Sequence, residues 1–112
     1  MARTQAEYRE RRRFQRHLVN ARVMLVHGSI GELVGRTRDI SDSGVFVEIS
    51  PVPRLPHGAH IKMHMLDSRM PGIAFNMKVA RTTQDGLGLM FIDYEVEGQR
   101  FSMDTLRKQF AK

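Results

Sequence analysis

Short runs in which apolar and polar residues alternate, separated by turn signals, recur along most of this chain and limit the folds open to it. In His60–Leu66 the apolar Ile61, Met63 and Met65 alternate with the polar His60, Lys62 and His64. Side chains two positions apart leave the same face of a strand, so this pattern predicts a strand with one buried face. Residues 73–81 alternate in the same way. Further β-rich runs occupy residues 18–26, 33–40, 45–49 and 88–92.

Turn-forming residues separate these runs at intervals of about ten residues. Residues 41–44 (SDSG) are a dense turn signal. Residues 50–58 contain three of the four prolines, which cannot donate to a strand ladder. Short, evenly spaced strands favour a mainly β fold, and we predict a small six-stranded antiparallel barrel over residues 17–94.

The last residues follow a helical period instead. Met103, Leu106 and Phe110 fall at positions i, i+3 and i+7, which places them on one face of a helix. We therefore predict that residues 95–112 form a C-terminal α-helix that covers one opening or edge of the barrel.

A length of 112 residues suits a single domain, because two smaller cores would each bury too little surface.

Composition excludes several classes of function. The chain has no Cys, so it cannot form a disulfide, a thiol nucleophile or a Cys-ligated metal centre. No apolar run approaches the roughly 20 residues that a membrane span needs, and residues 1–14 lack the apolar core of a secretory signal. We therefore expect a soluble, cytoplasmic protein with no membrane span.

The positive charge is concentrated at the N-terminus. Of the net charge of +6, residues 1–20 carry +4, from six Arg and two Glu. No Lys occurs before Lys62. Arg presents a planar fork of donors that matches a phosphate or a guanine edge, whereas Lys is a point charge. We predict that residues 1–16 are a flexible basic arm that an anionic ligand orders.

Two short motifs lie on either side of the first expected strand. They are R-R-x-x-x-R, formed by Arg11, Arg12 and Arg16, and D-x-S-x-x-G, formed by Asp39, Ser41 and Gly44. Asp39 and Ser41 are two apart, so both side chains leave one face of a strand end. A carboxylate can accept two N–H bonds from the Watson–Crick edge of guanine, and an Arg fork fits its O6 and N7 atoms. Gly44 provides the backbone shape for a turn and for close approach of a ligand.

With both motifs in this order, the sequence strongly resembles the PilZ family, bacterial receptor domains for the second messenger cyclic di-GMP. Glu10, Phe14 and the run Gly86-Leu87-Gly88-Leu89-Met90-Phe91 also match the family pattern. The resemblance extends over about residues 7–94 and implies a PilZ-like split barrel.

The resemblance also implies roles for the motif residues. Arg12 and Arg16 contact the phosphate and base of the ligand, and Asp39 and Ser41 contact guanine. An additional Arg immediately before the spaced pair, here Arg11, implies two intercalated cyclic di-GMP molecules per barrel.

The expected function is that of a receptor and adaptor without catalytic activity. Ligand binding changes the conformation of the arm, and a downstream protein in motility, attachment, biofilm or virulence control detects the change. Ser41 lies outside any nucleophile-elbow pattern and has no His at a recognisable spacing, so no catalytic residue is assigned. No cofactor is expected apart from the ligand.

An alternative from another class is an RNA-binding or protein-docking barrel whose arm contacts phosphates. Such barrels stack bases on exposed aromatic residues, whereas this chain has no Trp and only eight Phe and Tyr, mostly at core positions. His57, His60 and His64 could suggest a metal cluster, but no carboxylate lies near them, so no metal site is predicted. Arg81 either contacts the ligand or is a solvated strand end.

Overall fold

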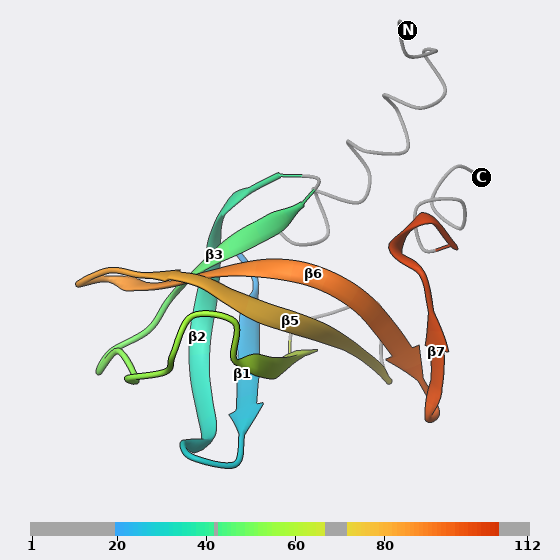
Figure 1. The fold of residues 1–112 in the computed structure, drawn as a ribbon, viewed down its shortest axis with the longest axis horizontal. Helices are drawn as coiled ribbons and strands as arrows, with labels where there is room; N and C mark the ends of the chain where they lie inside the picture. The colour runs from blue at the N-terminus through green and yellow to red at the C-terminus, as the bar shows by residue number, and fades with distance from the viewer. Residues whose placement is uncertain (1–19, 42, 67–71, 106–112) are drawn as a thin grey trace, which may run out of the picture.

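The computed structural model describes residues 20–41, 43–66 and 72–105, and these contain seven β-strands. The strands are β1 (Arg22–His27), β2 (Gly31–Ile40), β3 (Gly44–Glu48), β4 (His60–Met65), β5 (Ile73–Thr82), β6 (Gly86–Val96) and β7 (Gln99–Phe101). They pair in the order β3-β2-β1-β4-β5-β6-β7, and β3 also pairs with β6. This second pairing closes β1 to β6 into an antiparallel barrel, with β7 added beyond β6 (Figure 1). The predicted six-stranded barrel is confirmed.

The barrel core contains the residues that the alternation predicted to face inward. Ile61 and Met63 of β4 lie directly opposite Met77 and Phe75 of β5, and all four side chains are buried. Val23, Leu25, Val45, Val47, Leu87 and Leu89 belong to the same core. Full burial of one such large side chain contributes about 1.5–3 kcal/mol. The strands are therefore held together by one continuous apolar interior.

The C-terminal end of the fold differs from the helix predicted over residues 95–112. β6 continues to Val96 and pairs with β7 across the two-residue turn Glu97-Gly98. Both turn residues have positive φ, 52° and 83°, as type I′ hairpin turns require, and such turns match the twist of paired strands. Helical structure begins only at Met103, and its description ends at Thr105. Strand structure thus extends beyond residue 94, where the barrel was expected to end.

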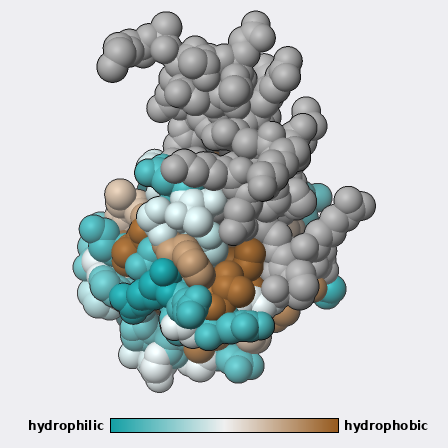
Figure 2. Space-filling model, turned by 90° about the vertical axis from the view of Figure 1, so that its right-hand side faces the viewer, coloured by the Kyte–Doolittle hydropathy of each residue, from teal (hydrophilic) through white to brown (hydrophobic). Residues whose placement is uncertain are grey.

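The outer surface mixes polar and apolar side chains. Figure 2 views the side where β6 ends and β7 lies, and it shows apolar side chains among hydrophilic ones. Among the residues that the structure describes, the large exposed apolar ones are Val34, Leu66, Met90 and Ile92. Within the described ranges, no helix is long and apolar enough to cross a membrane.

Candidate functional site

A β-bulge in β2 turns Asp39 onto the outer surface of the barrel. Arg38 pairs with Phe46 of β3 and Ile40 pairs with Val45, so Asp39 is an extra residue opposite no residue of β3. Ile40 packs against the core, whereas the Asp39 side chain is 72% exposed. Bulges redirect side chains and are common beside binding sites. The bulge therefore presents a carboxylate to solvent at the end of β2.

The turn after β2 is closed by the serine and the glycine of the D-x-S-x-x-G motif. The Ser41 amide donates to the Gly44 carbonyl at 2.9 Å, and the Gly44 amide donates to Ser41 Oγ at 3.2 Å. A Cβ at Gly44 would overlap the carbonyl oxygen of Leu89 on β6. Gly44 has no positive φ, so the need for glycine here comes from this close packing of β3 on β6.

Three of the predicted site residues line one shallow hollow of about 220 Å³ on the outer face of the barrel. They are Asp39, Ser41 and Gly44. Strands β3, β5 and β6 supply the other lining residues, which are Val45, Phe46, Ala80, Arg81, Gly88 and Leu89. Arg11, Arg12 and Arg16 lie outside the described residues, so their place in the site stays a prediction.

Arg38 restrains the Asp39 carboxylate from the side. Its Nε donates to Asp39 Oδ2 at 3.2 Å, and its Nη1 donates to Glu48 Oε1 at 2.7 Å. The guanidinium carbon also lies 4.4 Å from the centre of the Phe46 ring. Above all, the hydrogen bond to Glu48 raises the pKa of Arg38, which is therefore charged at physiological pH. A fixed positive charge thus lies directly beside the motif carboxylate.

The chain enters the barrel beside the strand that carries Asp39. Ala21 N donates to Thr37 Oγ1 at 2.8 Å, and Thr37 N donates to the Ala21 carbonyl at 2.9 Å. Arg36 Nη1 donates to the carbonyl of Asn20 at 3.1 Å. These bonds attach the residues that follow the predicted arm to the part of β2 just before the bulge.

Arg81 lines the same hollow as Asp39, together with Phe46. Regular alternation along β5 would turn Arg81 inward, because Val79 faces the core. A second bulge prevents this: Val79 pairs with Leu89 and Arg81 pairs with Gly88, which leaves Ala80 as the extra residue. The sequence alone does not decide the role of Arg81, because no residue pattern marks Ala80 as the site of a bulge.

Comparison with protein-family models decides the family. The model described as the PilZ domain matches residues 10–104, a range that contains both motifs. The chain belongs to the PilZ domain family. PilZ domains are bacterial domains that bind cyclic di-GMP, and they act as binding or adaptor domains rather than as enzymes. A search of the curated proteins finds no match to this chain.

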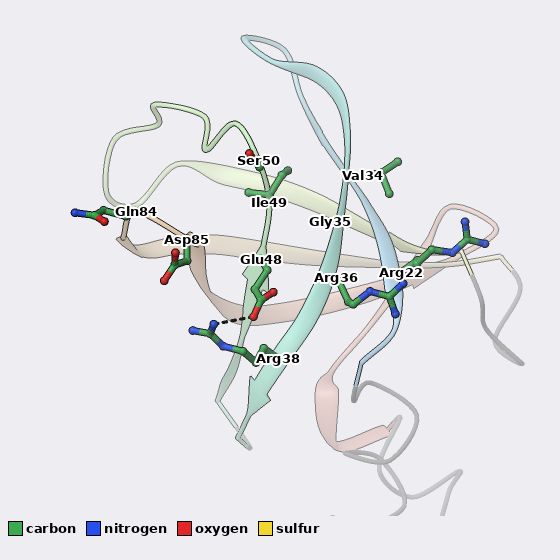
Figure 3. Close-up of a pocket in the computed structure, with 10 residues that line it drawn as sticks. All are labelled: Arg22, Val34, Gly35, Arg36, Arg38, Glu48, Ile49, Ser50, Gln84 and Asp85. Atoms are coloured by element: carbon green, nitrogen blue, oxygen red, sulfur yellow. Dashed lines mark hydrogen bonds and ion pairs between the residues drawn. The ribbon is translucent and has the colours of Figure 1, made fainter.

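In this PilZ domain a larger hollow, of about 620 Å³, adjoins the site. Arg22, Arg36 and Arg38 line it, and Glu48 is among the residues that face them. Figure 3 shows Arg38 extending from β2 toward Glu48 on β3. The two hollows share no lining residue, but the ion pair between Arg38 and Asp39 connects them. The arginines add positive charge next to the site, which favours the approach of an anionic ligand.

None of the described histidines of the PilZ domain lines either hollow. His60 and His64 are on β4 with Lys62 between them, and Lys62 Nζ forms an ion pair with Glu95 Oε2 at 3.0 Å. In the part of the chain that the structure describes, no three His, Cys, Asp or Glu residues gather closely enough to hold a metal ion.

Proposed function

We propose that this PilZ domain is a cytoplasmic receptor and adaptor for cyclic di-GMP, in which the basic arm and the hollow at Asp39 bind the same ligand. One observation carries the proposal: the β2 bulge turns a carboxylate outward in a hollow that Ser41 and Gly44 also line. Arg16 precedes Ala21 by five residues, a length of chain that spans at most about 18 Å. Because Ala21 is bonded to Thr37, two residues before Asp39, this length of chain allows Arg16 to reach the hollow.

The chemistry of the hollow suits guanine. The Asp39 carboxylate accepts hydrogen bonds from the N1–H and N2 amino groups of the base, and Ser41 adds one more bond beside it. The Watson–Crick edge of adenine does not offer this pair of donors to the carboxylate, so the site discriminates between the two purines. Arg12 and Arg16 neutralise the phosphates through charge-assisted hydrogen bonds, each of which contributes about 1.5–3 kcal/mol.

Binding also provides the signal. The arm carries many like charges and few apolar residues, so an anionic ligand that joins the arm to the barrel orders it. The ordered arm changes one surface of the domain, and a downstream protein in motility, attachment, biofilm or virulence control binds that surface.

Arg11 extends the proposal to two ligand molecules. Its guanidinium plane stacks on a purine face, and two intercalated cyclic di-GMP molecules present such faces. Calorimetric titration should therefore saturate at two ligands per chain, and Arg11→Ala should reduce this to one. Saturation of the wild-type chain at a single ligand would contradict the two-ligand proposal and leave the receptor function intact.

Calorimetry of the full chain with cyclic di-GMP also tests the receptor function. Arg12→Ala and Asp39→Ala should each weaken binding by at least about tenfold, the effect expected from losing one charge-assisted bond. Arg54→Ala is the matched control, because Arg54 is exposed in the proline-rich loop and lines neither hollow. This variant should bind like the wild type.

The RNA-binding alternative predicts a different result from the same titrations. Binding would then be unselective between single-stranded RNA, cyclic di-AMP and cyclic di-GMP, and would weaken steeply with salt. Among the described residues, every Phe and Tyr is buried or partly buried, which leaves no exposed aromatic surface there for stacking bases. Selective binding of cyclic di-GMP is therefore the expected outcome.

A further inference from the structure

Two β-bulges on different strands direct charged side chains into the same hollow. The bulge in β2 turns Asp39 outward, and the bulge at Ala80 in β5 does the same for Arg81. Without the extra residue, Arg81 would share the inward face of Val79, where a guanidinium would be buried in an apolar core. The second bulge therefore places a positive charge on the barrel wall near the carboxylate.

The absence of a side chain at Gly88 lets Arg81 lie flat across β6. A Cβ at this position would be 2.6 Å from Arg81 Cγ and 3.0 Å from its Nε. The guanidinium carbon consequently lies 5.5 Å from the centre of the Phe46 ring, within the range of a cation–π contact. The arrangement restrains a long side chain before any ligand arrives.

Phe46 is the support for this arrangement. Its neighbours Val45 and Val47 belong to the core, whereas Phe46 lies on the outer face of β3. The residue is nevertheless only 3% exposed, and the guanidinium groups of Arg38 and Arg81 lie over its ring. A buried aromatic ring thus supports two planar cations at the edge of the hollow.

We propose that Arg81 is a ligand-binding residue whose guanidinium plane stacks on a guanine base held by Asp39. The inference rests on the proposed function, and it adds a barrel-side contact to those of the arm. Arg81 is exposed, so a planar base can extend the stack of ring and guanidinium. Because Phe46 and Gly88 restrain the side chain beforehand, little of its conformational freedom remains to be lost on binding.

Calorimetric titration with cyclic di-GMP of the full-length Arg81→Ala, Arg81→Lys and Gly88→Ala chains tests this role. Arg81→Ala should weaken binding by about tenfold, and Arg81→Lys should weaken it to a similar degree, since Lys keeps the charge but lacks the plane. Gly88→Ala should weaken binding because its methyl group displaces Arg81. The double variant Gly88→Ala/Arg81→Ala should bind cyclic di-GMP as Arg81→Ala does, because the methyl group then has no Arg81 side chain to displace.

The outcomes separate this inference from the function on which it rests. If the wild-type chain binds cyclic di-GMP and Arg81→Ala binds within twofold of it, the inference is wrong and the receptor function stands. If Arg81→Lys binds with wild-type affinity, Arg81 contacts the ligand through its charge and does not stack on the base. If the wild-type chain fails to bind, the proposed function itself fails. Far-ultraviolet circular dichroism and thermal melts of each variant show whether a loss of affinity reflects unfolding.

Discussion

At the scale of single residues, Gly44 and Gly88 lie on paired strands of the same outer face, but a methyl group would meet different neighbours at each. At Gly44 it would overlap the backbone carbonyl of Leu89, whereas at Gly88 its nearest neighbours are atoms of the Arg81 side chain. Gly44→Ala should therefore lower the free energy of unfolding by about 1–3 kcal/mol, as overpacking does. Gly88→Ala should change it by less than about 0.5 kcal/mol. Urea denaturation compares the two, and equal losses would contradict this account of Gly44.

Lys62 and Glu95 provide a second test at this scale. The hydrogen bond from Lys62, and then that from Asn76, hold the pKa of the Glu95 carboxyl below its ordinary value of 4.5. Lys62→Met should raise this pKa, which an NMR pH titration of the Glu95 carboxyl measures. Lys62→Arg, which keeps a cationic donor, is the control.

The sign of the accompanying stability change follows from the direction of the shift. A pKa that is depressed in the folded state contributes stability above the ordinary value of 4.5, and this is lost as the pH falls through the lowered value. The difference in unfolding free energy between the wild type and Lys62→Met should therefore shrink on acidification. A constant difference would show that the ion pair does not govern this carboxyl.

At the scale of elements, the contact between β2 and the residues just before β1 holds the base of the arm. Ala21 is buried, and its amide donates to Thr37 Oγ1, so Thr37→Val would leave a buried N–H without this acceptor. The substitution should cost about 1–3 kcal/mol of stability. Thr37→Ser retains the hydroxyl and should therefore lose less stability than Thr37→Val. Denaturation of both variants measures the difference, and a larger loss for Thr37→Ser would contradict the assigned role of the hydroxyl.

The strands themselves could be predicted from sequence because residues such as Ile61 and Met63 repeat with a strict period of two. The bulges at Asp39 and Ala80 could not, since an extra residue is defined only by the register of the partner strand. For the same reason the spacing between Asp39 and Ser41 predicts only that Asp39 lies at a strand end, and the sequence does not define the orientation of Arg81. β7 was missed because a three-residue strand after Glu97-Gly98 is too short to show a period.

At the scale of the whole molecule, the account predicts a rigid barrel and an arm whose order depends on the ligand. Amide hydrogen exchange in residues 5–16 should slow on addition of cyclic di-GMP, because the arginines then bind the ligand. Core amides of β5, which belong to the closed barrel, serve as the internal reference. If exchange in the arm is unchanged at saturating ligand, the ligand does not order the arm, and the proposed signal is contradicted even where binding itself is intact.

The architecture of the whole molecule also shows which residues of the site can be predicted from the sequence and which cannot. The motif residues Asp39, Ser41 and Gly44 can be identified from the sequence, and the structure places all three around one hollow. Phe46 cannot be identified in this way. Its alternation with Val45 and Val47 places it on the outer face of a short strand, and an apolar residue there carries no sign of a binding role. It is recognised only through the two guanidinium groups that lie over its ring.

The central claim is that arginines of the N-terminal arm and the Asp39 carboxylate bind one and the same nucleotide. A crystal structure of the full chain with cyclic di-GMP tests it most directly. We predict that one bound ligand accepts hydrogen bonds from Arg12 or Arg16 and donates them from its guanine edge to Asp39. A ligand that contacts the arm while Asp39 is bonded only to Arg38 would contradict the claim.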